Sequence, residues 1–239
     1  MYRPPAHRLI APVVTVALAL GVAGCGQTAT SAAAPDTGTT VATTSVPPSP
    51  SPTGLASSPA VATPNAPGRY VFPVVGTASY ARSHHDYPAA DIMAPCGAKA
   101  VSPVDGTVLE VTRVDTYDHK VNAGATRGGL SISILGQDGA RYYGSHYSAI
   151  TAGIEPGVAV VAGQQIALVG KTGDAGACHV HFGLSPACTR TGDWWIRRGV
   201  IWPWPYLDAW RAGAAKSPMA EVTVWQASHG CPTKPLVDP

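Results

Sequence analysis

The chain has 239 residues, with 16 Lys and Arg against 14 Asp and Glu and a formal net charge of +2. This length allows one folded domain with a sizeable core beside terminal segments. The near-neutral charge argues against a nucleic-acid-binding protein, which would show a marked basic excess.

Residues 1–24 have the pattern of a bacterial export signal. Two arginines precede the apolar stretch Leu9–Val22, which is too short to span a bilayer comfortably. The segment ends in Val22-Ala23-Gly24-Cys25, which resembles a lipobox, in which the Cys is lipidated and becomes the new N-terminus. We therefore expect a lipoprotein signal peptide and a membrane anchor at Cys25, with the protein outside the cytoplasm and facing the cell wall. An ordinary cleaved secretory signal is the alternative.

Residues 25–68 are rich in Ala, Thr, Ser and Pro. After Cys25 they contain no aromatic residue and a single charge, Asp36. Such a composition buries too little apolar surface to offset the entropy of ordering, so it predicts a disordered linker. Residues 69–239 remain for the folded domain, and all six Trp lie there.

Most of this domain shows strand patterns. Leu130–Ile134 alternates strictly between apolar and small polar residues, and a turn at Gln137-Asp138-Gly139 leads into a second strand over Ala140–Tyr147. Ala100–Val111 and Val158–Val169 each read as strand, turn and strand. These patterns predict a mostly β fold, an antiparallel sheet that is barrel-like or a sandwich, with a substrate groove on one face.

Two further segments interrupt or follow the strands. Residues 115–129 predict an inserted loop, and only Tyr206–Ala215 predicts a short helix, so we expect few helices. Residues 194–210 form part of a C-terminal Trp-rich extension. We favour the interpretation that these rings pack on the core and cover a sheet face. The alternative is that some of them wall the substrate groove.

Four cysteines lie in the exported domain, and an even number in an oxidising compartment predicts disulfides. Of three possible connectivities we favour Cys178–Cys188 with Cys96–Cys231, because the first would brace the ends of a strand that carries two histidines. A thiolate zinc site is disfavoured, since no Cys-x-x-Cys spacing occurs.

That strand contains the most informative motif, Cys178-His179-Val180-His181-Phe182. Residues i and i+2 of a strand share one face, so His179 and His181 would present two imidazoles at one site. Three imidazole or carboxylate ligands around zinc leave a fourth position for water, which suits hydrolysis. Upstream residues complete the candidate set: His84, His85, Asp91 and His146.

The order of these motifs resembles the lysostaphin-type (LytM-type) zinc metallopeptidases, which cut peptide cross-links in bacterial peptidoglycan. Members carry a His…Asp motif running into D-I-x-A-P-x-G, then Y-x-H-x-S, G-x-T-G and finally H-x-H-F. The counterparts here are Asp91–Gly97, Tyr143–Ser148, Gly170–Gly173 and His179–Phe182. The His of the second motif comes one residue later than in the pattern. The resemblance covers roughly residues 70–186.

The resemblance implies a zinc site with Asp91 and His181 as ligands, and with His146 and His179 as catalytic histidines that do not bind the metal. The third ligand would be His84 or His85. Neither has the usual His-x-x-x-Asp spacing, and we favour His85 because it needs the shorter insertion. A second departure is a Gly at position 183, where the family often has Glu.

The function implied by the resemblance is zinc-dependent endopeptidase activity on peptidoglycan cross-links, in cell-wall remodelling. Its partners would be peptidoglycan peptides and, through the lipid anchor, the membrane; we expect no nucleic acid and a monomer. The alternative is a non-hydrolytic, zinc-containing module that binds the wall or regulates other wall enzymes. Turnover with added zinc separates the two.

Overall fold

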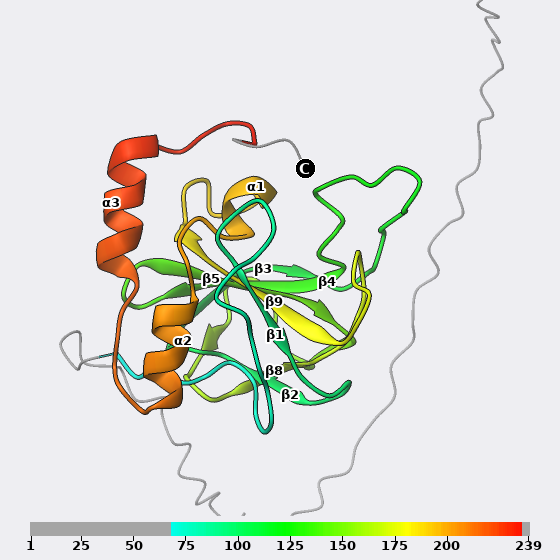
Figure 1. Ribbon diagram of the computed structural model, residues 1–239, viewed down its shortest axis with the longest axis horizontal. Helices are drawn as coiled ribbons and strands as arrows, with labels where there is room; N and C mark the ends of the chain where they lie inside the picture. The colour runs from blue at the N-terminus through cyan, green and yellow to red at the C-terminus, as the bar shows by residue number, and fades with distance from the viewer. Residues whose placement is uncertain (1–67, 236–239) are drawn as a thin grey trace, which may run out of the picture. The chain divides into compact units, whose positions relative to one another are not determined.

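The computed structural model describes residues 68–235 (Figure 1). The predicted signal peptide, the lipidation site Cys25 and the linker up to residue 67 lie outside the described residues. Within the described part, no helix has the length and apolar character needed to cross a membrane.

The larger of two sheets has six antiparallel strands in the order β1-β9-β5-β4-β3-β7. Strand β9, which carries the two histidines, therefore lies between β1 and β5. The bounds of the strands are β1 Ala90–Met93, β9 His179–Pro186, β5 Ala140–Tyr147, β4 Leu130–Gly136, β3 Gly106–Thr112 and β7 Ala159–Val160.

The smaller sheet has the order β2-β8-β6, with β2 at Lys99–Val101, β8 at Gln165–Leu168 and β6 at Ala149–Ile150. Strands β2 and β3 follow each other in sequence but belong to different sheets, and so do β7 and β8. The strand pairs predicted over residues 100–111 and 158–169 thus exist as strands but cross from one sheet to the other. The mostly β, antiparallel fold is confirmed, and the described residues form two sheets without a closed barrel.

The alternation of β4 decides which side of the large sheet faces the core. Ile132 and Ile134 are buried in the apolar core, together with Tyr142 of β5 and Val180 of β9. The opposite face carries polar residues such as Ser133 of β4, Arg141 of β5 and His181 of β9, and a helix, α1 (Trp194–Arg197), packs against β9 and β5. Gly183 of β9 lets the backbone at the end of α1 come close to this face.

Three short helices follow the strands (Figure 1). The helix predicted over Tyr206–Ala215 exists as α2, which begins two residues earlier and ends earlier, at Trp204–Arg211. Its Trp210 is buried in the core, stacked on Tyr70 at 5.7 Å between ring centroids. Helices α1 and α3 (Met219–His229) were not predicted. Only Val222 of α3 is buried, so that helix lacks the apolar periodicity that identifies a helix in sequence. Residues 115–129 form a loop, as predicted.

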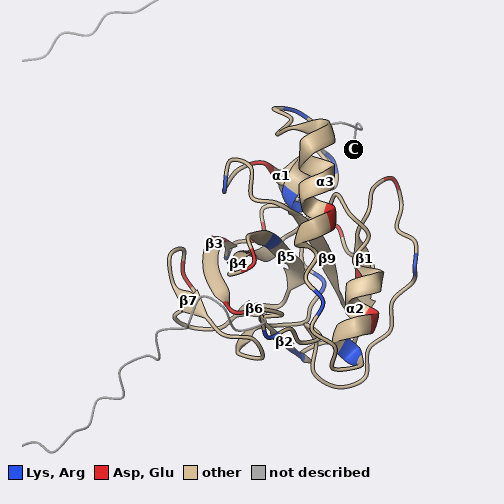
Figure 2. Cartoon of the chain, turned by 90° about the vertical axis from the view of Figure 1, so that its left-hand side faces the viewer, with Lys and Arg blue, Asp and Glu red and all other residues tan. Residues whose placement is uncertain are grey.

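Acidic and basic residues are interspersed over the described chain (Figure 2). Their mixture agrees with the near-neutral composition. The charges that bear on function are therefore those of individual residues and their partners.

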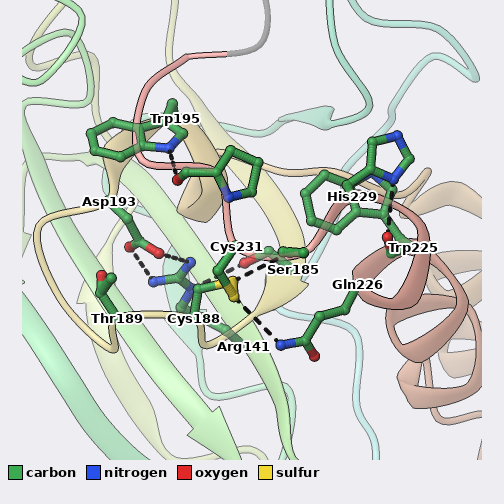
Figure 3. Close-up of a disulfide and its surroundings, with 12 residues drawn as sticks. Arg141, Ser185, Cys188, Thr189, Asp193, Trp195, Trp225, Gln226, His229 and Cys231 are labelled. Carbon is green, nitrogen blue, oxygen red and sulfur yellow. Dashed lines mark hydrogen bonds and ion pairs between the residues drawn. A yellow bond between two sulfur atoms is a disulfide. The ribbon is translucent and has the colours of Figure 1, made fainter.

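Two disulfides of the described residues join Cys96 to Cys178 and Cys188 to Cys231, the second of which is drawn in Figure 3. The favoured pairing was therefore wrong. Cys178 and Cys188 flank the eight residues of β9, and a strand of that length spans roughly 26 Å, far beyond the reach of one disulfide. Cys96 follows β1 and Cys178 precedes β9, and these strands are antiparallel neighbours with Met93 opposite His179. Their ends meet, with the two Cα atoms 5.2 Å apart.

Candidate metal centre and catalytic site

Strand pairing brings the carboxylate and the histidine pair together. Asp91 of β1 lies directly opposite His181 of β9, and on the other side of β9 His181 lies opposite Ser145 of β5. Directly paired residues of antiparallel strands place their side chains on the same face, close together. The Nδ1 atom of His181 is 3.2 Å from the Oδ1 atom of Asp91.

His84 completes a group of three. It lies before β1, and its Nε2 atom is 3.6 Å from Oδ1 of Asp91. The ligand atoms of His84, Asp91 and His181 all lie within 4.8 Å of one another. This is the separation at which one metal ion could contact all three.

His85 lines the same pocket but does not join this group. It is exposed, and its ring meets that of His84 edge to face at 5.1 Å. The structure therefore brings together the alternative candidate, His84, rather than the favoured His85. The intervening residues loop out before β1 begins, so a preference for the shorter insertion could not identify the inward-facing histidine.

His146 and His179 form the second half of the site, with ring centroids 4.6 Å apart. The register of β4 and β5 shifts here, because β5 advances three residues from Gly144 to Tyr147 while β4 advances two. His146 lies in this bulge with a φ of 66°, in the left-handed region. The extra residue in β5 therefore lies in the same motif in which His146 comes one position later than in the family pattern.

Four histidines of the site, other than His85, each have one ring nitrogen within hydrogen-bond distance of a backbone carbonyl. The pairs are His84 Nδ1 with Tyr87 at 3.2 Å, His146 Nδ1 with Thr172 at 2.7 Å, His179 Nδ1 with Ala177 at 2.9 Å, and His181 Nε2 with Arg198 at 2.8 Å. A carbonyl can only accept, so each of these nitrogens is an N–H donor. In the neutral rings the other nitrogen keeps its lone pair: Nε2 in three of them and Nδ1 in His181.

The electrostatics of the site keep Asp91 charged and His146 neutral. Burial alone would raise the pKa of Asp91, but when the metal-free rings of His181 and His84 are protonated, their hydrogen bonds and positive charges hold that pKa well below its usual range. Burial, followed by the charge of nearby His181, lowers the pKa of His146 to about 4, although the Thr172 carbonyl opposes the shift. The site therefore combines a stable carboxylate with a neutral imidazole.

The pocket around these groups has walls that the sequence did not predict. Trp194, Arg197 and Arg198 line it from α1 and the residue after it, and Arg127 lines it from the 115–129 loop. Trp194 thus walls the groove, whereas Trp210 packs in the core, so each interpretation of the Trp-rich segment holds for a different ring. The Trp-Trp-Ile-Arg-Arg run was visible in sequence, but nothing in it indicated which side chains face the site.

The second family departure, Gly183, has a steric explanation. A Cβ atom at this position would collide with the backbone carbonyl of Arg198. That carbonyl is the acceptor for Nε2 of His181. A glycine here is what allows the end of α1 to lie against β9 and to orient His181.

The segment that carries most of the site resembles a known peptidase family. Residues 85–191 match the model of Peptidase family M23. No curated protein matches this chain.

Similar solved structures include a lytM protein from Ruminococcus gnavus, with 22% identity over 63% of each chain and a TM-score of 0.47. The catalytic domain of the antimicrobial peptidase lysostaphin from Staphylococcus simulans has 20% identity, over 55% of this chain and 92% of that one, and a TM-score of 0.42. A zinc-containing peptidase from Vibrio cholerae has 22% identity, over 56% of this chain and 38% of that one, and a TM-score of 0.38. The chain thus spans less than two thirds of the first and third of these proteins.

Proposed function

We propose that this protein is a zinc-dependent endopeptidase that hydrolyses peptide cross-links of bacterial peptidoglycan. The observation that carries the proposal is the convergence of four histidines and Asp91 in one pocket, each histidine fixed by a backbone carbonyl so that its second nitrogen is available for chemistry. The match to Peptidase family M23 supports the same reaction class.

The donor set fits zinc. Nε2 of His84, a carboxylate oxygen of Asp91 and Nδ1 of His181 are nitrogen and oxygen ligands of the kind that catalytic zinc sites use, and they lie within one ion's reach. We propose these three as the ligands, with His84 in place of His85. When bound, zinc would polarise the scissile carbonyl and lower the pKa of a water molecule.

His146 and His179 lie beside the ligands without belonging to the group of three, although Nε2 of His179 is 3.7 Å from Oδ1 of Asp91. Their rings are 4.6 Å apart, close enough to act on the same reacting group. One ring would take the proton of the attacking water on Nε2, and the other, when protonated on Nε2, would donate a hydrogen bond to the developing oxyanion. The proton would then pass to the leaving amine.

The test is mass spectrometry of cross-linked peptidoglycan after incubation with the full chain and zinc. We expect new monomeric stem peptides with the wild type and none with His179→Ala, which should still hold zinc. An unchanged peptide profile with zinc bound to the wild type would overturn the proposal. It would indicate instead a non-hydrolytic module that binds the wall or regulates other enzymes.

We also propose that the protein acts outside the cytoplasm, anchored through a lipid on Cys25. The support is the signal-like segment and the Val22–Cys25 motif. Fractionation of cells that express the full chain tests this proposal. The wild type should enter the detergent phase, and Cys25→Ala should leave it; equal partitioning of both would argue against the anchor.

A further inference from the structure

The pocket contains a positively charged side chain, that of Arg198, which has no role in the proposed mechanism. The side chain of Arg198 lines the pocket with Asp91 and His181, and its backbone carbonyl is 2.8 Å from Nε2 of His181. The guanidinium therefore belongs to a residue that already contacts a proposed zinc ligand. Any group bound by this guanidinium would lie in the same pocket as the scissile bond.

Neighbouring arginines have carboxylate partners. Arg141 makes two hydrogen bonds to the carboxylate of Asp193, at 2.6 and 2.9 Å, with both side chains buried (Figure 3). Arg197 is 2.6 Å from a carboxylate oxygen of Glu110. These pairs explain why two buried arginines are tolerated beneath the site.

Arg198 differs from both. Within residues 68–235 no carboxylate lies within 4.0 Å of its guanidinium; Asp86 acts on it only from farther away. Arg127 adds a second guanidinium to the same pocket; its Nε donates to Oδ1 of Asn122 at 2.9 Å, and its nearest carboxylate, Asp174, is 4.0 Å away. Arg198 thus presents a guanidinium to the pocket with no carboxylate in direct contact, although Asp86 and Asp174 also line the pocket.

Two aromatic rings hold the guanidinium in place. Its central carbon is 4.0 Å from the ring centroid of Tyr87 and 5.2 Å from that of Trp194. Such stacking suits the flat guanidinium group of arginine and limits the rotation of the side chain. The Nε atom of Arg198 is buried and has no hydrogen-bond partner among the described residues. A buried donor without an acceptor is costly, and an anion bound on the other guanidinium nitrogens, which face the pocket, would compensate the charge of this side chain.

We propose that Arg198 binds a free carboxylate of the substrate, so that the preferred substrate is an acidic wall peptide with a carboxylate close to the scissile bond. This inference rests on the proposed endopeptidase function and specifies its substrate class. An oriented guanidinium and a carboxylate form short, paired, charge-assisted hydrogen bonds. An uncharged oligoglycine bridge offers only backbone carbonyls, which bind a guanidinium more weakly and leave its charge without a counter-ion.

The test uses two synthetic cross-linked peptides that are identical except at one position next to the scissile bond, where one has a free carboxylate and the other the carboxamide. The full chain with zinc is compared with Arg198→Gln, which removes the charge but keeps the carbonyl that orients His181. Arg198→Lys keeps the charge without the planar fork. Arg113→Gln is the matched control, because Arg113 lies outside the pocket and pairs with the exposed Glu155.

We expect the wild type and Arg113→Gln to cleave the carboxylate peptide with a kcat/KM on the order of 10- to 100-fold above that for the carboxamide. Arg198→Gln should retain zinc and lose this preference, with a larger fall in kcat/KM for the carboxylate peptide than for the carboxamide, and Arg198→Lys should keep part of the preference. Equal kcat/KM values for the two peptides in the wild type, or a preference that survives in Arg198→Gln, would overturn the assignment and leave the endopeptidase function intact.

If the wild type cleaves neither peptide, the proposed function fails, and calorimetric titration of the same two peptides still decides the role of Arg198. Tighter binding of the carboxylate peptide, lost in Arg198→Gln, would support it. Equal binding of the two peptides would overturn it.

Discussion

His181 and Arg198 are joined by a hydrogen bond from Nε2 of the histidine to the backbone carbonyl of the arginine, with 2.8 Å between the two atoms. This bond directs the other ring nitrogen, Nδ1, toward Asp91. Residue 183 is directly involved, because any Cβ there would overlap the same carbonyl. The orientation of one proposed zinc ligand thus depends on a helix end and on a glycine two residues further along the strand.

The first prediction follows from this contact. Gly183→Ala should push the end of α1 away from β9, lower the free energy of unfolding by about 1–3 kcal/mol and weaken zinc binding about 10- to 100-fold. Denaturant titration and competition with a chelator measure the two effects. Gly176→Ala is the control, because a Cβ there meets nothing within 4 Å. Unchanged zinc affinity in Gly183→Ala would mean that the His181–Arg198 contact does not orient the ligand.

The second prediction concerns the adjacent histidines. His84→Ala should lose stoichiometric zinc, because its Nε2 atom belongs to the three-residue group, whereas His85→Ala should retain it. Metal content after dialysis measures the difference. The opposite result, with zinc lost only in His85→Ala, would restore the sequence-based preference and require the loop before β1 to rearrange on metal binding.

These two residues show how far sequence reasoning extends. The alternation of Leu130–Ile134 and the His-x-His spacing on β9 depend on local geometry, so the strands and the shared face of His179 and His181 could be predicted. The choice between His84 and His85 depends on how a loop folds back on β1, which leaves no periodic signal. Arg198 lies in the site because α1 packs on β9, and no rule of sequence spacing predicts a contact between these two segments.

The prediction of the disulfide pairing was wrong for a related reason. Bracing one strand was a local argument, whereas the pairing depends on which strand ends meet, and the β1–β9 register determines that for Cys96 and Cys178. The sequence gives the number of residues between the cysteines, but it does not give the order of the strands in the sheet.

The third prediction separates metal binding from catalysis. Asp91→Ala and His181→Ala should each lose both zinc and peptidase activity, since each removes a proposed ligand. His179→Ala should keep zinc and lose activity, because its Nε2 atom would serve proton transfer or oxyanion binding. Metal analysis and peptide cleavage on the same samples measure both properties. Cleavage that persists in His181→Ala would contradict the mechanism.

The fourth prediction concerns the disulfide next to the site. Replacing Cys96 and Cys178 together with Ser opens a link across 82 residues and should lower the free energy of unfolding by about 2–4 kcal/mol. Activity should fall as well, because Cys178 anchors the start of the strand that carries His179. The matched control is the double Ser variant of Cys188 and Cys231, which should lose stability but retain more activity. Equal losses of activity in both variants would argue against a specific role for the Cys96–Cys178 link.

The last prediction uses the pH dependence of stability in metal-free protein. The pKa of His146 is about 4 in the folded chain, against the ordinary histidine value of 6.5 that applies once the chain unfolds, so above pH 6.5 the ring is neutral in both states and has no effect. Between pH 6.5 and 4 only the unfolded state takes up the proton, so the free energy of unfolding should fall as the pH falls. The full loss, reached below pH 4, is about 3 kcal/mol.

His146→Asn should remove this component. Asn tolerates the left-handed backbone at this position, and its side-chain amide can donate to the Thr172 carbonyl as Nδ1 does. Denaturant titrations of both proteins at about pH 7, 5.5 and 4.5 with a chelator measure the difference. The stability of the variant should decline less on acidification than that of the wild type. Parallel declines would show that His146 is protonated as readily in the folded chain as in the unfolded one, and that burial does not keep this ring neutral.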